Sequence, residues 1–417
     1  MTKLTLNRLP EINNRLPVRV RLTITAHRLL ISVLCGFILT VNGMAQNKLT
    51  FQGQLSSWSF YNQNNDLPLW LGVRYLPELS YKINMSNDKL IDFDGTANIY
   101  GTEGFRPFEK NYSDGKVKPY RLWARYSSDQ FELRLGLQKI NFGSAALLRP
   151  LMWFDQVDPR DPLQLTNGVW GLLGRYYFLN NDNIWLWVLY GNNEIRTWDI
   201  GNTNKNSPEL GGRFQFSVPD GEAAITFHHR NVEGNELIRQ LSGYNNSSVL
   251  LSNISENRIG IDGKLNLGAG VWFEGAWINK NKNIGMLTNQ ENLTAGIDYT
   301  FDVGNGLYII FENLLSSYDE KAFSFSNTNS FSALSLSYPL GILDNVGAIL
   351  YYDWKNHVSY NFINFRRQYD NISLYLMAYW NSQSGNAIQI LPNGNSDAAS
   401  EQLLSGKGIQ FMFVLYH

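Results

Sequence analysis

Three things are scarce in this chain of 417 residues: cysteine, charge, and long apolar runs after the first 45 residues. Its single cysteine, Cys35, allows no disulfide framework within one chain. Basic and acidic residues nearly balance, at 35 against 36, so no basic surplus indicates binding to nucleic acid. The longest later apolar segments, such as residues 184–190, are too short for a transmembrane helix, which excludes a helical membrane protein.

The first 45 residues have the pattern of a secretory leader. An apolar run at residues 29–41 follows a basic segment, and Gly43 and Ala45 supply the small residues that a signal peptidase requires. A helix over that run would span only about 20 Å, short of the roughly 30 Å hydrocarbon core, so a membrane anchor is disfavoured. We predict a signal peptide at residues 1–45, cleaved after Ala45, and a single mature domain at residues 46–417. The basic segment contains Arg15, Arg19, Arg21 and Arg28.

Aromatic residues are abundant, with 12 Trp, 22 Tyr and 23 Phe, an excess typical of β-rich chains that meet two apolar–water boundaries. Beyond the leader, segments of about ten residues alternate apolar and polar side chains. This alternation is typical of a strand with one face in lipid and the other in a lumen. At residues 131–138, for example, Phe131, Leu133, Leu135 and Leu137 alternate with Glu132, Arg134, Gly136 and Gln138.

The connections between these segments alternate in length, which distinguishes a membrane barrel from a soluble β-sandwich. In transmembrane barrels short turns face the periplasm and long loops face outward, because successive hairpins reverse across one membrane. The pattern predicts an all-β fold, a transmembrane antiparallel up-and-down β-barrel of about 18 strands, with roughly 16 as the alternative count. Short connections are expected near residues 87–88, 127–129, 180–183, 219–221, 267–270 and 302–306. Long ones are expected at residues 101–115, 143–167, 191–207, 231–256, 279–291, 315–329 and 381–405.

The chain ends in an alternating aromatic strand at residues 408–416. This strand resembles the C-terminal assembly signal of outer-membrane proteins, although the last residue is His417 and not an aromatic carbocycle. We therefore expect the barrel-assembly machinery and outer-membrane lipid as partners, with a homo-oligomer possible. The face that carries the signal contains Phe411, Phe413 and Leu415.

The connection at residues 143–167 is too apolar for a loop in water, so we hypothesise that it folds into the lumen as a constriction. A barrel of this size is too wide for its own inward side chains to fill. The alternative is that the loop caps the barrel mouth without touching the permeation path. Its candidate functional residues are Arg149, Asp155, Asp158, Arg160 and Asp161.

Strand parity directs a group of charged side chains inward near this loop. They form either a basic stripe that attracts anions or a set of ion pairs that braces the loop. The bracing interpretation pairs the arginines with Glu132, Asp155, Asp158 and Asp161, and mixed charges on neighbouring strands favour it slightly. The candidate channel-lining residues are Arg121, Arg125, Glu132, Arg134, Arg175 and Arg213.

A run of motifs carries a family resemblance. They read Arg134-x-Gly136-x-Gln138, Phe142-Gly143, Arg149-Pro150 and Asp158-Pro159-Arg160-Asp161-Pro162. This run resembles the central hairpin of porin-like barrels related to the alginate-export and phosphate-selective porin groups. The resemblance implies a diffusion channel in the Gram-negative outer membrane, and it carries over no substrate-binding residue.

An enzyme is not predicted, and neither is a metal or another cofactor. Four histidines follow the leader, and none has a Ser or Asp at recognisable catalytic spacing; neighbouring His228 and His229 should point to opposite faces of a strand. The sequence therefore predicts a passive pore for small polar or charged solutes. The alternatives are a non-conducting barrel that binds a partner or serves secretion and, less favoured, an outer-membrane hydrolase.

Overall fold

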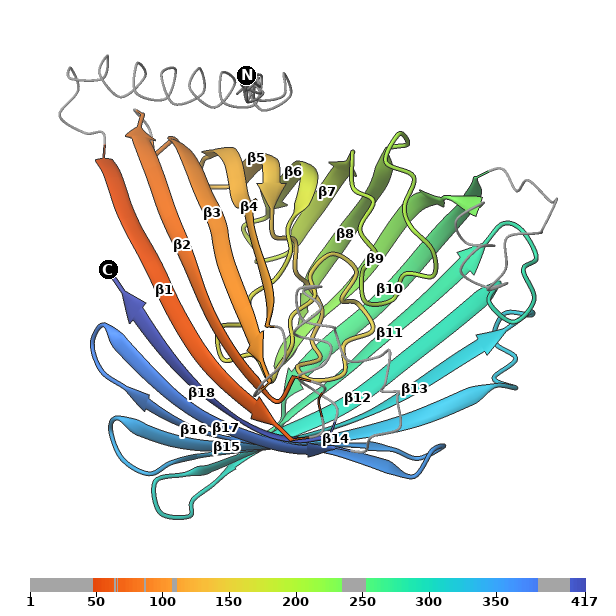
Figure 1. The fold of residues 1–417 in the computed structure, drawn as a ribbon. Coiled ribbons are helices and arrows are strands. Elements are labelled where there is room, and N and C mark those ends of the chain that lie inside the picture. The colour runs from red at the N-terminus through yellow and green to blue at the C-terminus, as the bar shows by residue number, and fades with distance from the viewer. Residues whose placement is uncertain are drawn as a thin grey trace, which may run out of the picture. The chain divides into compact units, whose positions relative to one another are not determined.

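The computed structural model describes residues 48–63, 65, 67–85, 88–106, 111–234, 253–381 and 406–417. These described residues contain eighteen strands in one antiparallel sheet (Figure 1). The predicted leader at residues 1–45 lies outside them. The strands are β1 (Lys48–Asn62), β2 (Leu69–Asn84), β3 (Leu90–Phe105), β4 (Tyr112–Ser127), β5 (Phe131–Gln138), β6 (Val169–Tyr177), β7 (Asn183–Leu189), β8 (Glu209–Val218), β9 (Gly221–Val232), β10 (Ile254–Asn266), β11 (Gly270–Lys280), β12 (Asn289–Phe301), β13 (Leu307–Asp319), β14 (Thr328–Pro339), β15 (Asp344–Asp353), β16 (Val358–Gln368), β17 (Ile372–Asn381) and β18 (Lys407–Tyr416).

The sheet closes on itself. Each strand pairs with the strand before it and the strand after it, and β18 returns to β1 in a register that runs from Gln54↔Tyr416 to Asn62↔Gly408. Closure gives each strand a neighbour on both sides, which removes the open edges of an ordinary sheet. The predicted up-and-down barrel of about 18 strands is therefore confirmed. None of the described residues forms a helix long and apolar enough to cross a membrane.

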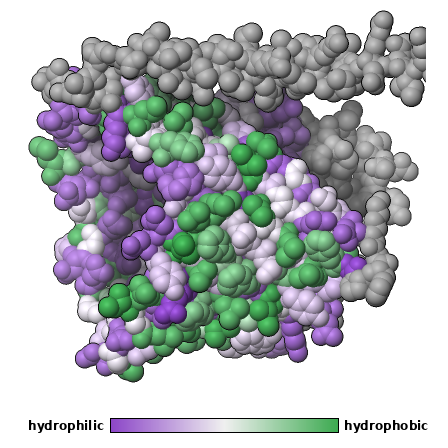
Figure 2. Space-filling model, turned by 60° about the vertical axis from the view of Figure 1, so that its left-hand side comes forward, coloured by the Kyte–Doolittle hydropathy of each residue, from purple (hydrophilic) through white to green (hydrophobic). Residues whose placement is uncertain are grey.

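The two faces of the wall differ in chemistry, as the alternation predicts. On β5 the apolar side chains of Phe131, Leu133 and Leu135 are exposed, whereas Glu132 between them is buried. Other strands repeat the pattern, and Figure 2 shows hydrophobic residues spread over much of the wall that it presents. Exposed apolar side chains fit a lipid environment, so the exposed face is the outer one and the buried polar face lines the lumen.

Connection length separates the two ends of the barrel. Turns of two to five residues join β2 to β3, β4 to β5 and so on to β16–β17, and they include residues 128–130 and 219–220. Most connections at the opposite end are longer, among them residues 139–168 and 190–208. One expected loop was wrong: most of residues 101–115 is strand, because β3 and β4 continue to Phe105 and from Tyr112 in a paired hairpin.

The paired length of neighbouring strands becomes much shorter after β4. This strand pairs with β3 along its whole length, but with β5 only from Leu122 to Ser127. β5 and β6 leave the wall together at the Gln138↔Val169 pair. The unpaired edge of β4 carries Lys118 and Pro119, residues that discourage pairing with another strand. The chain between β5 and β6 is thus directed away from the wall.

If the exposed face of the wall meets lipid, replacing an exposed leucine by arginine should destabilise the protein on a strand but not in a turn. Leu135 is 61% exposed on the outer face of β5, whereas Leu179 is 92% exposed in the turn at residues 178–182. An arginine facing lipid near the membrane midplane costs about 2–4 kcal/mol. We expect Leu135→Arg to lower the free energy of unfolding in lipid vesicles by about that amount, and Leu179→Arg to change it by less than about 0.5 kcal/mol. Equal effects in a urea titration would contradict the assignment.

Candidate functional site

Residues 139–168, here called the inner loop, lie against the inner face of β10–β13. The face follows from parity: Glu274 and Glu312 are buried at 1% and 0%, whereas the neighbouring Phe273 and Phe311 are 48% and 44% exposed on the outside. Both glutamates contact the inner loop. The loop starts and ends at β5 and β6, and its contacts pass from Trp187 of β7 to these two glutamates, so it lies inside the barrel (Figure 1).

Two wall carboxylates hold the backbone of the inner loop. Glu312 accepts hydrogen bonds from the N–H groups of Ala146, Leu147 and Leu148, at 2.6, 2.9 and 2.6 Å. Glu274 accepts them from Ala145 at 2.9 Å and from Leu151 at 2.5 Å. Five backbone donors outside the sheet are satisfied in this way.

Apolar side chains of the inner loop pack between those anchors. Leu151 and Trp153 are at most 1% exposed, and they lie over Gly260 of β10. A Cβ atom at Gly260 would lie 2.4 Å from Leu151 Cδ2, so any other residue there would require the Leu151 side chain to shift. Phe154 meets the ring of His228 edge-on at 4.9 Å between centroids. The apolar side chains of the loop therefore belong to one buried core that they share with the inner face of the wall.

The five predicted charged residues of the loop brace it internally. Arg149 pairs with Asp155 at 3.2 Å, and Arg160 pairs with Asp158 at 2.7 Å. Asp161 accepts the backbone N–H groups of residues 163 and 165, and burial raises the pKa of its carboxyl group. These ion pairs and hydrogen bonds join residues of the loop to one another, so the five side chains stabilise the fold of the loop.

The predicted wall arginines meet around one carboxylate. Glu132 lies 3.4 Å from Arg125, 2.9 Å from Arg134 and 3.7 Å from Arg175, and Arg125 also binds Asp92 at 2.8 Å. The predicted pairing of arginines with Glu132 is thus present, whereas Asp155 and Asp158 have their partners within the loop. This group lies beside the short turns, and we call it the arginine group. Its arginine side chains are 15–25% exposed.

Two other predicted lining residues serve the inner loop. Arg121 donates to the backbone oxygen of Thr166 at 2.9 Å. Arg213 binds Asp262 at 2.6 Å, and the other oxygen of Asp262 accepts from Ser144 of the loop at 3.1 Å. Both arginines therefore connect the wall to the loop, but neither binds a carboxylate that the bracing interpretation named.

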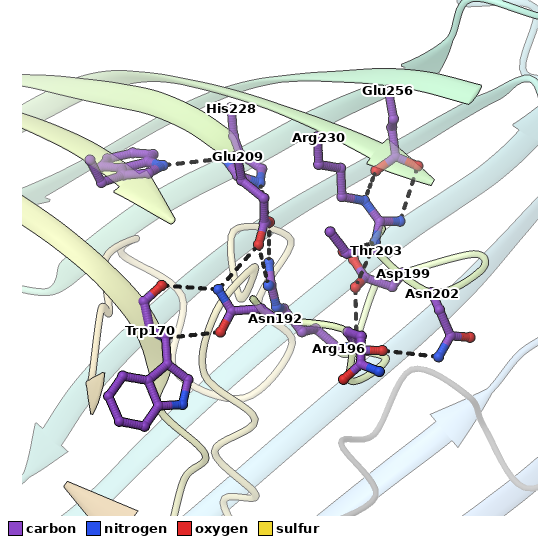
Figure 3. A network of polar contacts seen from close by, with 12 residues as sticks. Trp170, Asn192, Arg196, Asp199, Asn202, Thr203, Glu209, His228, Arg230 and Glu256 are labelled. Carbon is purple, nitrogen blue, oxygen red and sulfur yellow. Dashed lines mark hydrogen bonds and ion pairs between the residues drawn. The ribbon is translucent and has the colours of Figure 1, made fainter. Parts of the chain in front are cut away.

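Sequence reasoning predicted a long connection at residues 191–207 but missed that residues 190–208 enter the barrel. In this loop, Arg196 and Asp199 bind Glu209 and Arg230 of the wall (Figure 3). It also missed the wall anchors Glu274 and Glu312. Inward parity would have identified the two glutamates as lumen residues, but no local signal in the sequence indicates which loop they bind.

His228 occupies a structural position. Its Nδ1 accepts from Trp187 Nε1 at 3.2 Å, and its Nε2 lies 3.2 Å from Glu209 (Figure 3). His229 points outward to Asn257, as parity predicted. Within the part of the chain that the structure describes, no three His, Cys, Asp or Glu side chains are arranged to hold a metal ion.

Comparison with known proteins shows similarity of fold. No family and no curated protein matches the chain in sequence. OccAB4 of Acinetobacter baumannii is 11% identical, with 91% of this chain and 100% of that chain covered and a TM-score of 0.52. OccAB1 of the same organism is 7% identical, with 90% and 97% covered and a TM-score of 0.51. An anion-selective porin from Comamonas acidovorans is 12% identical, with 89% and 100% covered and a TM-score of 0.42. At these identities the first two comparisons concern the barrel fold alone.

The carboxylate anchors predict that the inner loop loosens when Glu312 is neutralised. Gln keeps only one acceptor oxygen, so Glu312→Gln leaves buried N–H groups unpaired at a cost of about 2–3 kcal/mol. Thermolysin, which cleaves before leucine, should then cut folded protein at Leu148, which is 2% exposed in the native loop. Glu291→Gln is the control, since Glu291 accepts from Phe323 and does not touch the inner loop. Equal resistance of both variants would contradict the anchoring.

Proposed function

We propose that this chain is a porin-like channel of the Gram-negative outer membrane for small polar or charged solutes, narrowed by the inner loop. The observation that supports the proposal is the position of residues 139–168 inside the barrel, where Glu274 and Glu312 of the inner wall hold them. Barrels of 16–18 strands leave a water-filled interior. A loop held across such an interior reduces its width without sealing it by a separate plug domain, and this is the design of a selective diffusion pore.

The surface chemistry supports an outer-membrane location. Exposed apolar side chains cover the outer face of the barrel, and closed barrels are the β-structures that satisfy their backbone in lipid. We include in the proposal a cleaved leader at residues 1–45 and insertion by the barrel-assembly machinery through β18. His417 supports the second point, since its ring lies 5.6 Å from Phe51 and 5.8 Å from Tyr75 between centroids. The terminal imidazole thus takes the place of the expected aromatic ring.

A non-enzymatic role fits the contacts of the inward histidine. His228 is 0% exposed and bound to Trp187 and Glu209, so it has no free face for a substrate. The alternative function is a non-conducting barrel whose long loops bind a partner. The channel and the partner-binding barrel differ in one measurable property, which is ion conductance.

Conductance of purified, heat-modifiable protein in planar lipid bilayers tests the proposal. We expect discrete, stable current steps, because a constricted open lumen conducts ions. The negative control is the same protein unfolded and diluted from urea. Silence from protein that is folded by its gel shift would refute the channel and favour the partner-binding barrel.

The arginine group predicts the sign of a selectivity change. Arg125, Arg134 and Arg175 face Asp92 and Glu132, which is three positive charges against two negative ones. If the solute path passes them, Arg134→Gln should shift the reversal potential in asymmetric KCl toward cations, by about 5–10 mV.

The control for this change is Arg367→Gln. Arg367 pairs with Asp344 near the short-turn end of β16, and its side chain is 44% exposed. The substitution removes the same charge at a position outside the arginine group. Unchanged reversal potentials in Arg134→Gln would assign the arginine group to bracing alone.

A further inference from the structure

The loop at residues 190–208, here called the latch loop, is tied to the inner wall by buried ion pairs. Arg196 binds both oxygens of Glu209, each at 2.8 Å, and the two side chains are 6% and 1% exposed. This geometry is bidentate, which is the strongest form of an arginine–carboxylate pair. Figure 3 shows Glu209 of β8 next to His228 of β9, with Arg196 of the latch loop bound to Glu209.

Asp199 makes the second attachment of the latch loop. One of its oxygens accepts from Arg258 Nη2 at 2.5 Å, and the other lies 2.9 Å from Arg230 Nη1. All three side chains are 0% exposed. Arg230 also donates to Thr203 Oγ1 at 2.9 Å, farther along the same loop (Figure 3). A single carboxylate from the loop thus bridges two strands of the wall, β9 and β10.

Charge balance on the wall depends on Asp199. Arg230, Arg258 and Lys280 surround Glu256, at 2.6, 2.6 and 3.1 Å. With Asp199 the group holds three positive and two negative charges, and without it three positive charges face one negative charge. Buried charges that lack partners are strongly unfavourable. The wall therefore favours the position of the latch loop in which Asp199 is inserted.

The latch loop also contacts the inner loop. Trp198 donates its indole N–H to the backbone oxygen of Arg149 at 2.7 Å. The guanidinium group of Arg196 lies 5.5 Å from the ring of Phe154, and that of Arg258 lies 5.9 Å from the ring of Trp153. Two residues that precede Asp199 in the chain, and one of its own partners, thus touch the inner loop. A displacement of Asp199 would remove support from that loop.

We propose that Asp199 is a positioning residue for the channel, and that the latch loop sets how far the inner loop extends across the lumen. This inference rests on the proposed function, because it explains what holds the constriction in place. Glu274 and Glu312 hold the inner loop through backbone N–H groups of residues 145–151, and the latch loop binds the backbone oxygen of Arg149 in the same segment. The constriction is then an assembly of two loops on a charged wall.

The test compares Asp199→Asn with Glu194→Gln in planar bilayers. Glu194 lies in the same loop but is exposed, so its replacement removes the same charge without touching the buried group. We expect Asp199→Asn to raise single-channel conductance about twofold and to shift selectivity toward anions, because the wall keeps an unbalanced positive charge. Glu194→Gln should leave conductance unchanged. Asp199→Glu, which restores the charge, should recover part of the native value.

A second readout follows the inner loop directly. Leu148→Cys is introduced in a Cys35→Ser background, and the new thiol is titrated with a membrane-impermeant maleimide. Leu148 is 2% exposed, so the thiol should react slowly in the native loop and about tenfold faster with Asp199→Asn. Trp198→Phe keeps the ring and all charges but loses the bond to Arg149, and it should raise the rate too. This variant tests the coupling if Asp199→Asn fails to fold.

The two readouts separate this inference from the proposed function. If no form of the protein conducts, but the thiol becomes reactive with Asp199→Asn and not with Glu194→Gln, the channel is refuted and the latch stands. If the protein conducts, but neither conductance nor thiol reactivity responds to Asp199→Asn or Trp198→Phe, the latch is refuted and the channel stands.

Discussion

Every backbone N–H and C=O group in a bilayer must find its partner within the protein, and the rest of this structure depends on that constraint. The chain meets it by closing β18 onto β1 in a ring of eighteen strands. A ring of this size leaves a lumen that its inward side chains cannot fill. The inner loop enters the lumen, and five of its buried N–H groups also need acceptors, because they lie outside the sheet. Glu274 and Glu312 supply the acceptors from the far wall.

The buried charges of the lumen divide into two kinds of group. Around Glu132, arginines from three strands are paired within the wall itself, so that group needs no loop. Around Glu256, three cations approach balance only when Asp199 enters from the latch loop. The first group belongs to the solute-facing surface in our proposal, and the second holds a loop in position. Burial makes the difference, since unpaired charge is costly in proportion to its removal from water.

Much of the fold was predictable, because a strand in a membrane wall has only two environments. Alternation of side chains located the strands, and alternation of connection length gave the barrel, its strand number and the loop at residues 143–167. The prediction was wrong at residues 101–115, where β3 and β4 extend into a long paired hairpin. That hairpin is rich in polar residues and glycine, and this composition predicts a loop from the sequence alone. Pairing with a neighbour made it strand, which is how tertiary context overrides local propensity.

The sequence by itself determined which side chains face lipid and which face the lumen, because the period of a strand is two and its outer face must be apolar. It also named Glu132 as a partner of inward arginines, in one of the two interpretations that it left open. Only the tertiary structure decided that Glu274 and Glu312 bind residues 145–151, or that Asp199 reaches Arg230 and Arg258. Those partners are far apart in the chain, and a loop's path through a lumen follows from packing against all walls at once. No local periodicity encodes such a path.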